Sequence, residues 1–259
     1  MANRHEAETD FAKSLDFTAN FKVAYIWAYL LGLRKAEMYC KTLPASDGLA
    51  ACVDQVVVDH GLQIARIKKA AQFIPRTGAL LITANHPTGI LDGAVLFCAL
   101  LSRRSDVKII ANDVLCSVPV LGSQIIPVKK TNAGDMRSLS ALMEIRRAWK
   151  RGECVVVFPA GTVAHWQWKR LAIADAPWTT NIQDFAKTLK IPECRAELAV
   201  KNPAWFHVFA AVSRTARVAL LLRAFFSSAG NQPSDLVVFN LLGKCADNTS
   251  ATSSQASHY

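Results

Sequence analysis

Short apolar runs alternate along this chain with longer segments in which apolar residues recur every three or four positions. The short runs predict buried strands, whereas the longer periodic segments predict helices with one apolar face. Strands that alternate with helices in this way indicate an α/β domain with a mixed, mostly parallel sheet flanked by helices. Strands are expected at residues 62–67, 79–83, 107–111, 124–128 and 155–158. Helices are expected at 49–60, from the turn after strand 79–83 to about residue 102, and at 135–149.

An apolar segment at 21–33 precedes this alternation and predicts an N-terminal apolar helix. Its core of eleven residues, 23–33, is flanked by Lys22 and by Arg34-Lys35. Eleven residues are too few to cross a bilayer. The basic flanks and the aromatic residues fit a helix that lies in the membrane interface, and packing on the main domain fits equally well.

A second mixed segment, at 205–223, combines aromatic residues with arginines and predicts a basic amphipathic helix that packs in the core or touches a membrane. The chain then ends in a Ser/Thr-rich stretch that is expected to be disordered. We therefore expect a leader and membrane-interface helix at 1–45, an α/β domain at 46–242 and a disordered tail at 243–259.

Composition suggests a partner that is both apolar and anionic. Of the 259 residues, 51% are hydrophobic and 19% charged, and the formal net charge is +10. A phospholipid surface fits this combination. The basic residues are scattered and no nucleic-acid-binding motif is present, which argues against nucleic acid. Seven cysteines without a C-x-x-C pair indicate reduced thiols and no metal site, and the polar N-terminus carries no secretory signal. These features favour the cytoplasmic side of a membrane, with peripheral or monotopic attachment.

The segment 84–93, Ala-Asn-His-Pro-Thr-Gly-Ile-Leu-Asp-Gly, carries the candidate chemistry. It places His86 on a strand-to-helix turn and Asp92 in the first turn of the following helix. A histidine can take a proton near neutral pH, and a carboxylate within reach can fix its tautomer and stabilise the imidazolium. Two plainer interpretations stay open: His86 is a buried histidine bonded to the backbone, or Asp92 only caps the helix. Asn85 is expected mainly to support the turn.

Parallel sheets bind ligands at the carboxyl ends of their strands, where both the His86 turn and a second turn at Pro159 fall. Together with a third stretch, these turns resemble the glycerolipid acyltransferase family. The three blocks are Asn85-His86-Pro87-x-Gly89-x-x-Asp92-Gly93, the segment 122–130 that ends in Lys129-Lys130, and Phe158-Pro159-Ala160-Gly161-Thr162. The five residues between His86 and Asp92 are similar to the hemolysin-like branch of bacterial lysophospholipid acyltransferases. Shorter likenesses, including Ala176-Pro177-Trp178, extend the resemblance over about 30–226.

The resemblance implies a fold like that of glycerol-3-phosphate acyltransferases. It implies transfer of a fatty acyl group from acyl-CoA or acyl carrier protein to the hydroxyl of a lysophospholipid-like acceptor, with no cofactor beyond the acyl donor. His86 would be the general base and Asp92 its partner. The helix start after Gly89 would offer N–H groups to an oxyanion or phosphate. The remaining expected substrate-binding residues are Asn85, Lys129, Lys130, Gly161 and Thr162.

Two departures from the family pattern bear on the acceptor. The third block has Ala160 and Thr162 where family members carry a glutamate, so no carboxylate remains in that turn. The fourth block, at 192–200, alternates charged with apolar residues, which predicts an edge-like strand with one solvated face. They leave two alternatives open: a catalytically weakened membrane- or lipid-binding protein on the same fold, and acyl transfer to a non-phosphate, amino-acid-derived lipid.

Overall fold

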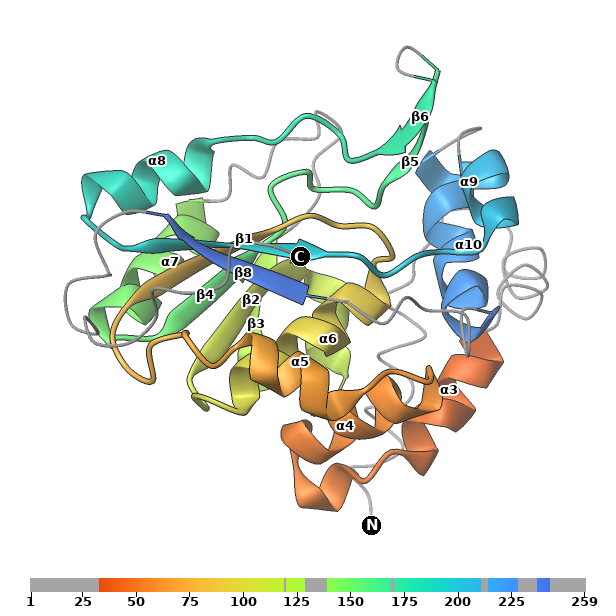
Figure 1. Ribbon diagram of the computed structural model, residues 1–259, viewed down its shortest axis with the longest axis horizontal. Helices are drawn as coiled ribbons and strands as arrows, with labels where there is room; N and C mark the ends of the chain where they lie inside the picture. Colours follow the sequence, from red (N-terminus) through yellow and green to blue (C-terminus); the bar gives the residue numbers. More distant parts are fainter. Residues whose placement is uncertain are drawn as a thin grey trace, which may run out of the picture.

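The computed structural model describes residues 33–118, 120–128, 139–168, 171–210, 214–227 and 237–242. A six-stranded sheet with the order β3-β2-β4-β1-β7-β8 runs through its centre (Figure 1). The first five strands in this order are mutually parallel, and β8 is antiparallel to β7. The strands are β1 (Leu80–Ala84), β2 (Val107–Asn112), β3 (Ile125–Val128), β4 (Cys154–Val157), β7 (Glu193–Leu198) and β8 (Val237–Leu242).

The strand β1 lies at the heart of this sheet, between β4 and β7. All five of its residues are buried, as are all four of β4. A central strand of a parallel sheet is covered on both faces, which explains why both read as uninterrupted apolar runs in the sequence. These runs led to the prediction of a mixed, mostly parallel sheet flanked by helices, and the structure confirms that prediction.

Helices cover both faces of the sheet. Apolar side chains of α4 (Leu49–Asp59), α5 (Ile64–Ala70) and α6 (Ile90–Leu101) form one hydrophobic cluster with the strands. Side chains of α7 (Leu139–Lys150) and α8 (Asn181–Thr188) form the second cluster, against the other face. Short 3-10 helices lie at Ala45–Asp47, Asp113–Ser117 and Gly122–Gln124.

Three further helices and a hairpin complete the part of the chain that the structure describes. The helix α3 (Leu33–Thr42) reaches α10 (Arg214–Ser227) through Tyr39, whose ring makes edge contacts with Phe225 and Phe226. The helix α9 (Ala204–Ala210) contacts both α10 and a two-stranded antiparallel hairpin of β5 (His165–Gln167) and β6 (Ala172–Ala174). Figure 1 shows this hairpin projecting beside α9.

One predicted strand is wrong. The segment 62–67 was expected to be extended, but α5 begins at Ile64. Leu62, Ile67, Ala71 and Ile74 are all buried. Of these, only Ile67 lies within α5, and the other three flank the helix. The short apolar run by itself does not distinguish a helix from a strand.

The fourth-block strand is correct in its alternation and wrong in its place. Side chains of β7 are alternately buried and exposed along Cys194–Leu198, as the charged and apolar residues predict. However, β7 pairs with β1 on one side and β8 on the other, so it is an interior strand. The strand β8, which the sequence did not reveal, occupies this end of the sheet.

The helix expected at 205–223 is two helices, α9 and α10, within the described residues. The apolar segment at 21–32, the tail after 242 and the pair Lys129-Lys130 lie outside the described residues. The proposed division at 45 and 243 therefore stays a prediction. No helix in the described part of the chain is long and apolar enough to cross a membrane.

Candidate active site

The turn between β1 and α6 carries His86 at the carboxyl end of the central strand. The strand ends at Ala84 and the helix begins at Ile90. The imidazole of His86 stacks on the ring of Phe158, which follows β4, with 4.1 Å between centroids and 24° between planes. Its side chain is only 18% exposed. The neighbouring strand thus holds one face of the imidazole.

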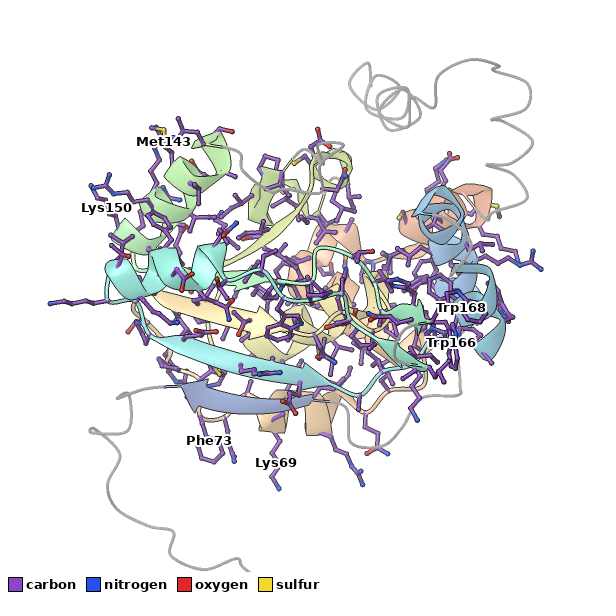
Figure 2. All side chains as sticks on the ribbon, turned by 90° about the horizontal axis from the view of Figure 1, so that it is seen from above. Lys69, Phe73, Met143, Lys150, Trp166 and Trp168 are labelled. Atoms are coloured by element: carbon purple, nitrogen blue, oxygen red, sulfur yellow. The ribbon has the colours of Figure 1, made fainter. Side chains whose placement is uncertain are left out.

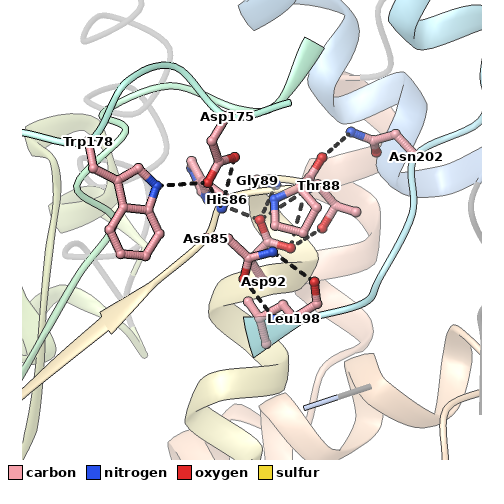
Figure 3. Close-up of polar contacts among 10 residues, drawn as sticks. Asn85, His86, Thr88, Gly89, Asp92, Asp175, Trp178, Leu198 and Asn202 are labelled. Atoms are coloured by element: carbon pink, nitrogen blue, oxygen red, sulfur yellow. Dashed lines mark hydrogen bonds and ion pairs between the residues drawn. The ribbon is translucent and has the colours of Figure 1, made fainter. Parts of the chain in front are cut away.

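The carboxylate of Asp92 lies beside the His86 ring (Figure 3). Nδ1 of His86 is 2.9 Å from Oδ2 of Asp92, whose side chain is fully buried. The N–H direction is poor for a hydrogen bond, so the contact is chiefly electrostatic. A carboxylate at this edge favours the tautomer with its proton on Nδ1. The lone pair is then on Nε2, the arrangement that a general base requires.

The same carboxylate caps α6. It accepts hydrogen bonds from the backbone N–H groups of Thr88, at 2.9 Å, and Gly89, at 2.8 Å, and from the Thr88 hydroxyl. These donors stabilise a charge that would be costly to bury alone. The structure thus shows two contacts of Asp92: its carboxylate caps the helix and lies beside His86.

Asn85 ties the turn to the neighbouring strand β7. Its side-chain amide donates to the Leu198 carbonyl at 2.8 Å, and its carbonyl accepts the Leu198 N–H at 2.7 Å. The Asn202 amide, from the segment between β7 and α9, donates to the Pro87 carbonyl at 3.2 Å. Both contacts support the turn. The second contact was not predicted, because Asn202 lies in no recognisable sequence motif.

Asp175 is a second carboxylate at the turn, and sequence reasoning missed it. Its oxygens accept the backbone N–H of His86, at 3.2 and 3.3 Å, and Oδ2 also accepts the indole N–H of Trp178 at 3.1 Å (Figure 3). On the other side of the residue, the Ala164 N–H donates to the His86 carbonyl at 2.8 Å. The backbone of His86 is thereby held from both sides. The nearby motif Ala176-Pro177-Trp178 was the available signal.

Gly89 is required where it stands. Its φ is +90°, in the left-handed region that favours glycine. A Cβ at this position would meet the Leu221 side-chain methyls at 2.9 Å and Val163 Cγ2 at 3.1 Å. The glycine therefore lets α10 and the segment before β5 approach the start of α6 closely.

The third-block turn follows β4 and shares the sheet edge with His86. Gly161 has φ +61° and its N–H donates to the Phe158 carbonyl at 2.9 Å. Gly161 is exposed and Thr162 is half-buried. The structure thus brings both predicted residues to the edge that carries His86, in a turn without a carboxylate. Lys129 and Lys130 follow β3, which β2 and β4 separate from β1.

Several buried polar atoms in the neighbouring elements have no hydrogen-bond partner within the described residues. They include Asn202 Oδ1, Trp166 Nε1 in β5 and His207 Nδ1 in α9. Burial lowers the pKa of His207, so the neutral imidazole is favoured there. Among the described residues no three or more His, Cys, Asp or Glu side chains gather to hold a metal.

A histidine–carboxylate pair at the carboxyl edge of a mostly parallel sheet defines a site suited to proton abstraction. Comparison with known families makes this more specific. Residues 66–192 match the family model of the acyltransferases, a range that includes β1, the His86 turn, α6 and the third-block turn. This part of the chain therefore belongs to the acyltransferase family. A comparison with curated proteins gave no match.

Proposed function

We propose that this protein transfers a fatty acyl group from acyl-CoA or acyl carrier protein to the hydroxyl of a lysophospholipid or related lipid. We place it in the hemolysin-like branch and at the cytoplasmic side of a membrane, where such acceptors partition. The observation that carries the proposal is the 2.9 Å approach of His86 Nδ1 to the buried Asp92 carboxylate inside the acyltransferase domain. The acyl donor is a co-substrate, and the mechanism needs no metal.

The proposed reaction begins with His86 Nε2 taking the proton of the acceptor hydroxyl. The hydroxyl oxygen then attacks the thioester carbonyl carbon and forms a tetrahedral oxyanion. Collapse of this oxyanion breaks the carbon–sulfur bond, and the imidazolium returns the proton to the leaving thiolate. A serine nucleophile is unnecessary because the thioester is already activated. Asp92 stabilises the imidazolium between the two proton transfers.

The start of α6 is the proposed oxyanion site, with one restriction that the geometry imposes. The N–H groups of Thr88 and Gly89 already donate to Asp92. They therefore cannot serve the oxyanion while the cap is in place. The next two amides of the helix, at Ile90 and Leu91, have no intrahelical acceptor in an α-helix and are the donors we propose.

Acceptor recognition is proposed to involve three positions along the sheet edge. Gly161 and Thr162 would line the acceptor beside His86, and Lys129 or Lys130 would hold a phosphate at the end of β3. Three strand spacings separate β3 from β1, roughly 14 Å. A phosphate there would belong to a part of the substrate distant from the reacting hydroxyl. We assign Asn85 to a supporting role in the turn, because the backbone of Leu198 engages both the NH₂ group and the carbonyl oxygen of its side-chain amide.

The turn of Ala160, Gly161 and Thr162 supports a second candidate, since it lacks the carboxylate that the family carries there. The acceptor is then an amino-acid-derived lipid, or the protein binds lipid with weakened catalysis.

One experiment separates these functions: release of free thiol from acyl-CoA, measured with lysophosphatidic acid and with a lyso-ornithine lipid. We expect lysophosphatidic acid to stimulate release and His86→Ala to lower turnover about 10²- to 10⁴-fold. His165→Gln is the control, because His165 lies in β5 and its ring faces the Val163 carbonyl. Unchanged turnover in His86→Ala would refute the general-base assignment. Vesicle binding without release by any acceptor would favour the lipid-binding alternative.

A further inference from the structure

The β5–β6 hairpin exposes an unusual set of large apolar side chains. Trp168 is 73% exposed, Leu171 72% and Ile173 50%. Figure 2 shows Trp168 at the end of the molecule where the hairpin lies, far from Phe73 and Met143. Another exposed pair, Leu139 and Met143 on α7, is accompanied on that helix by the ion pair of Glu144 with Arg147.

The base of this hairpin is bonded directly to the candidate active site. The residue before β5, Ala164, donates its N–H to the His86 carbonyl. The side-chain amide of Gln167, on β5, donates to the carbonyl of Ala174 on β6, at 3.1 Å, and to that of Asp175 just after β6, at 2.6 Å. The Asp175 carboxylate in turn accepts the His86 N–H. Because these hydrogen bonds join the hairpin to the His86 turn, a surface that binds the hairpin is held at a fixed distance from His86.

The chemistry of the hairpin matches an anionic bilayer surface. Residues 165–174 contain no acidic side chain, and Lys169 and Arg170 occupy the sequence between the two strands. Tryptophan favours the headgroup region, leucine and isoleucine favour the acyl chains beneath it, and basic residues attract anionic headgroups. Trp166 packs edge-on against Trp168, with 6.1 Å between ring centroids.

We propose that the β5–β6 hairpin inserts the exposed side chains of Trp168, Leu171 and Ile173 into an anionic lipid surface and so brings the His86 turn to the acceptor. The insertion itself depends only on the exposed residues, while its purpose rests on the proposed function. The hairpin is a second contact, separate in sequence from the apolar segment at 21–33.

The test measures partition into phosphatidylcholine vesicles with and without phosphatidylglycerol. We expect the double variant Trp168→Ser/Leu171→Ser to lower partition into the anionic vesicles about tenfold or more, because two large apolar side chains no longer leave water. The matched control is Leu139→Ser/Met143→Ser, which removes two comparably exposed apolar side chains from α7 and should bind within about twofold of wild type. Equal partition of the two double variants would overturn the proposal.

Depth is measured by quenching of tryptophan fluorescence with brominated lipids. We expect brominated lipids to quench a smaller fraction of the tryptophan fluorescence in Trp168→Phe than in wild type. Trp27, in the apolar segment at 21–33, is present in both proteins and therefore cannot cause this difference. Unchanged quenching in this variant would also overturn the proposal, as would a dimer in solution that the Trp168→Ser/Leu171→Ser variant dissociates, because the hairpin would then join two copies of the chain.

The hairpin and the proposed reaction can fail separately. His86→Ala should bind vesicles like wild type while losing turnover. If wild type inserts Trp168 but transfers no acyl group, the hairpin proposal stands and the proposed function falls. If the Trp168→Ser/Leu171→Ser variant acylates bilayer-embedded acceptor as fast as wild type, the reverse holds.

Discussion

At the scale of single residues, Asp92 joins stability to chemistry. Its buried carboxylate accepts three hydrogen bonds from Thr88 and Gly89 and contacts His86 at 2.9 Å. The donors hold the carboxylate in place, and the carboxylate holds the imidazole. A substitution at Asp92 therefore changes both properties, whereas a substitution at one of its donors should change mainly the first.

Asp92→Asn should lower turnover about a hundredfold or more, because the imidazolium loses its counter-charge. It should also lower the free energy of unfolding, because the new amide N–H₂ opposes the donors that the carboxylate accepted. Thr88→Val is the matched control: it removes one hydroxyl donor, should cost about 1 kcal/mol and should keep turnover within a few-fold. Urea unfolding and thiol release measure the two properties. Equal loss of turnover in both variants would contradict a specific contribution of the carboxylate.

Asp175 acts on His86 through the backbone rather than the ring. Asp175→Ala removes the acceptor of the His86 N–H and should lower kcat about tenfold with little change in KM, since the imidazole is mispositioned rather than lost. Glu193→Gln is the control, because Glu193 is also half-buried but bonds to Thr83 and Gln183. Steady-state kinetics decide: a wild-type kcat in Asp175→Ala would show that the Ala164 contact is sufficient.

At the scale of elements, the sequence predicts what local pattern determines. Strands buried on both faces and the β1–α6 turn with His86 and Asp92 were found because their signals are contiguous. The helix α5 was mistaken for a strand because a short apolar run fits both structures. β7 was placed at an edge because nothing in its sequence reports its neighbour β8. Asp175 was missed because it meets His86 from 89 positions away, and only the fold brings them together.

The approach of α10 to the start of α6 is testable through Gly89. Gly89→Ala should destabilise the protein by about 2 kcal/mol or more, through the positive φ and through contact with Leu221. Leu221→Ala removes the methyls that the new Cβ would meet. In the double variant the steric part should be relieved, which gives a favourable coupling energy in a double-mutant cycle. A coupling energy of zero would mean that backbone strain alone accounts for the loss.

At the scale of the whole molecule, the carboxyl ends and the amino ends of the strands carry different kinds of polar residue. The carboxyl edge carries His86, Asp92, Asp175 and the third-block turn. The amino edge carries the buried Arg104, which pairs with Asp106 and donates to the carbonyls of Pro75, Gly78 and Gly152. These partners precede β1, β2 and β4, so Arg104 joins the starts of three strands. Chemistry is thus placed at one edge while stabilising charge is placed at the other.

The reactivity of the cysteines can be used to measure how the central sheet opens. Cys154 on β4 and Cys194 on β7 are buried on either side of β1, whereas Cys40 and Cys116 are exposed. Burial raises the pKa of the Cys154 and Cys194 thiols to about 12. Raising a thiol pKa from about 9 to about 12 lowers the thiolate fraction at pH 8 about a thousandfold.

In the folded protein a thiol reagent should therefore modify Cys40 and Cys116 first and reach Cys154 and Cys194 only on global unfolding. Labelling rates of the individual peptides by mass spectrometry, with and without urea, measure this. The rates at the two buried positions should rise together, because one parallel sheet holds both cysteines and opens as a unit. Fast labelling of Cys194 alone in the absence of urea would show that β7 and β8 separate from β1 independently, and with them the Leu198 backbone that holds Asn85 in the catalytic turn.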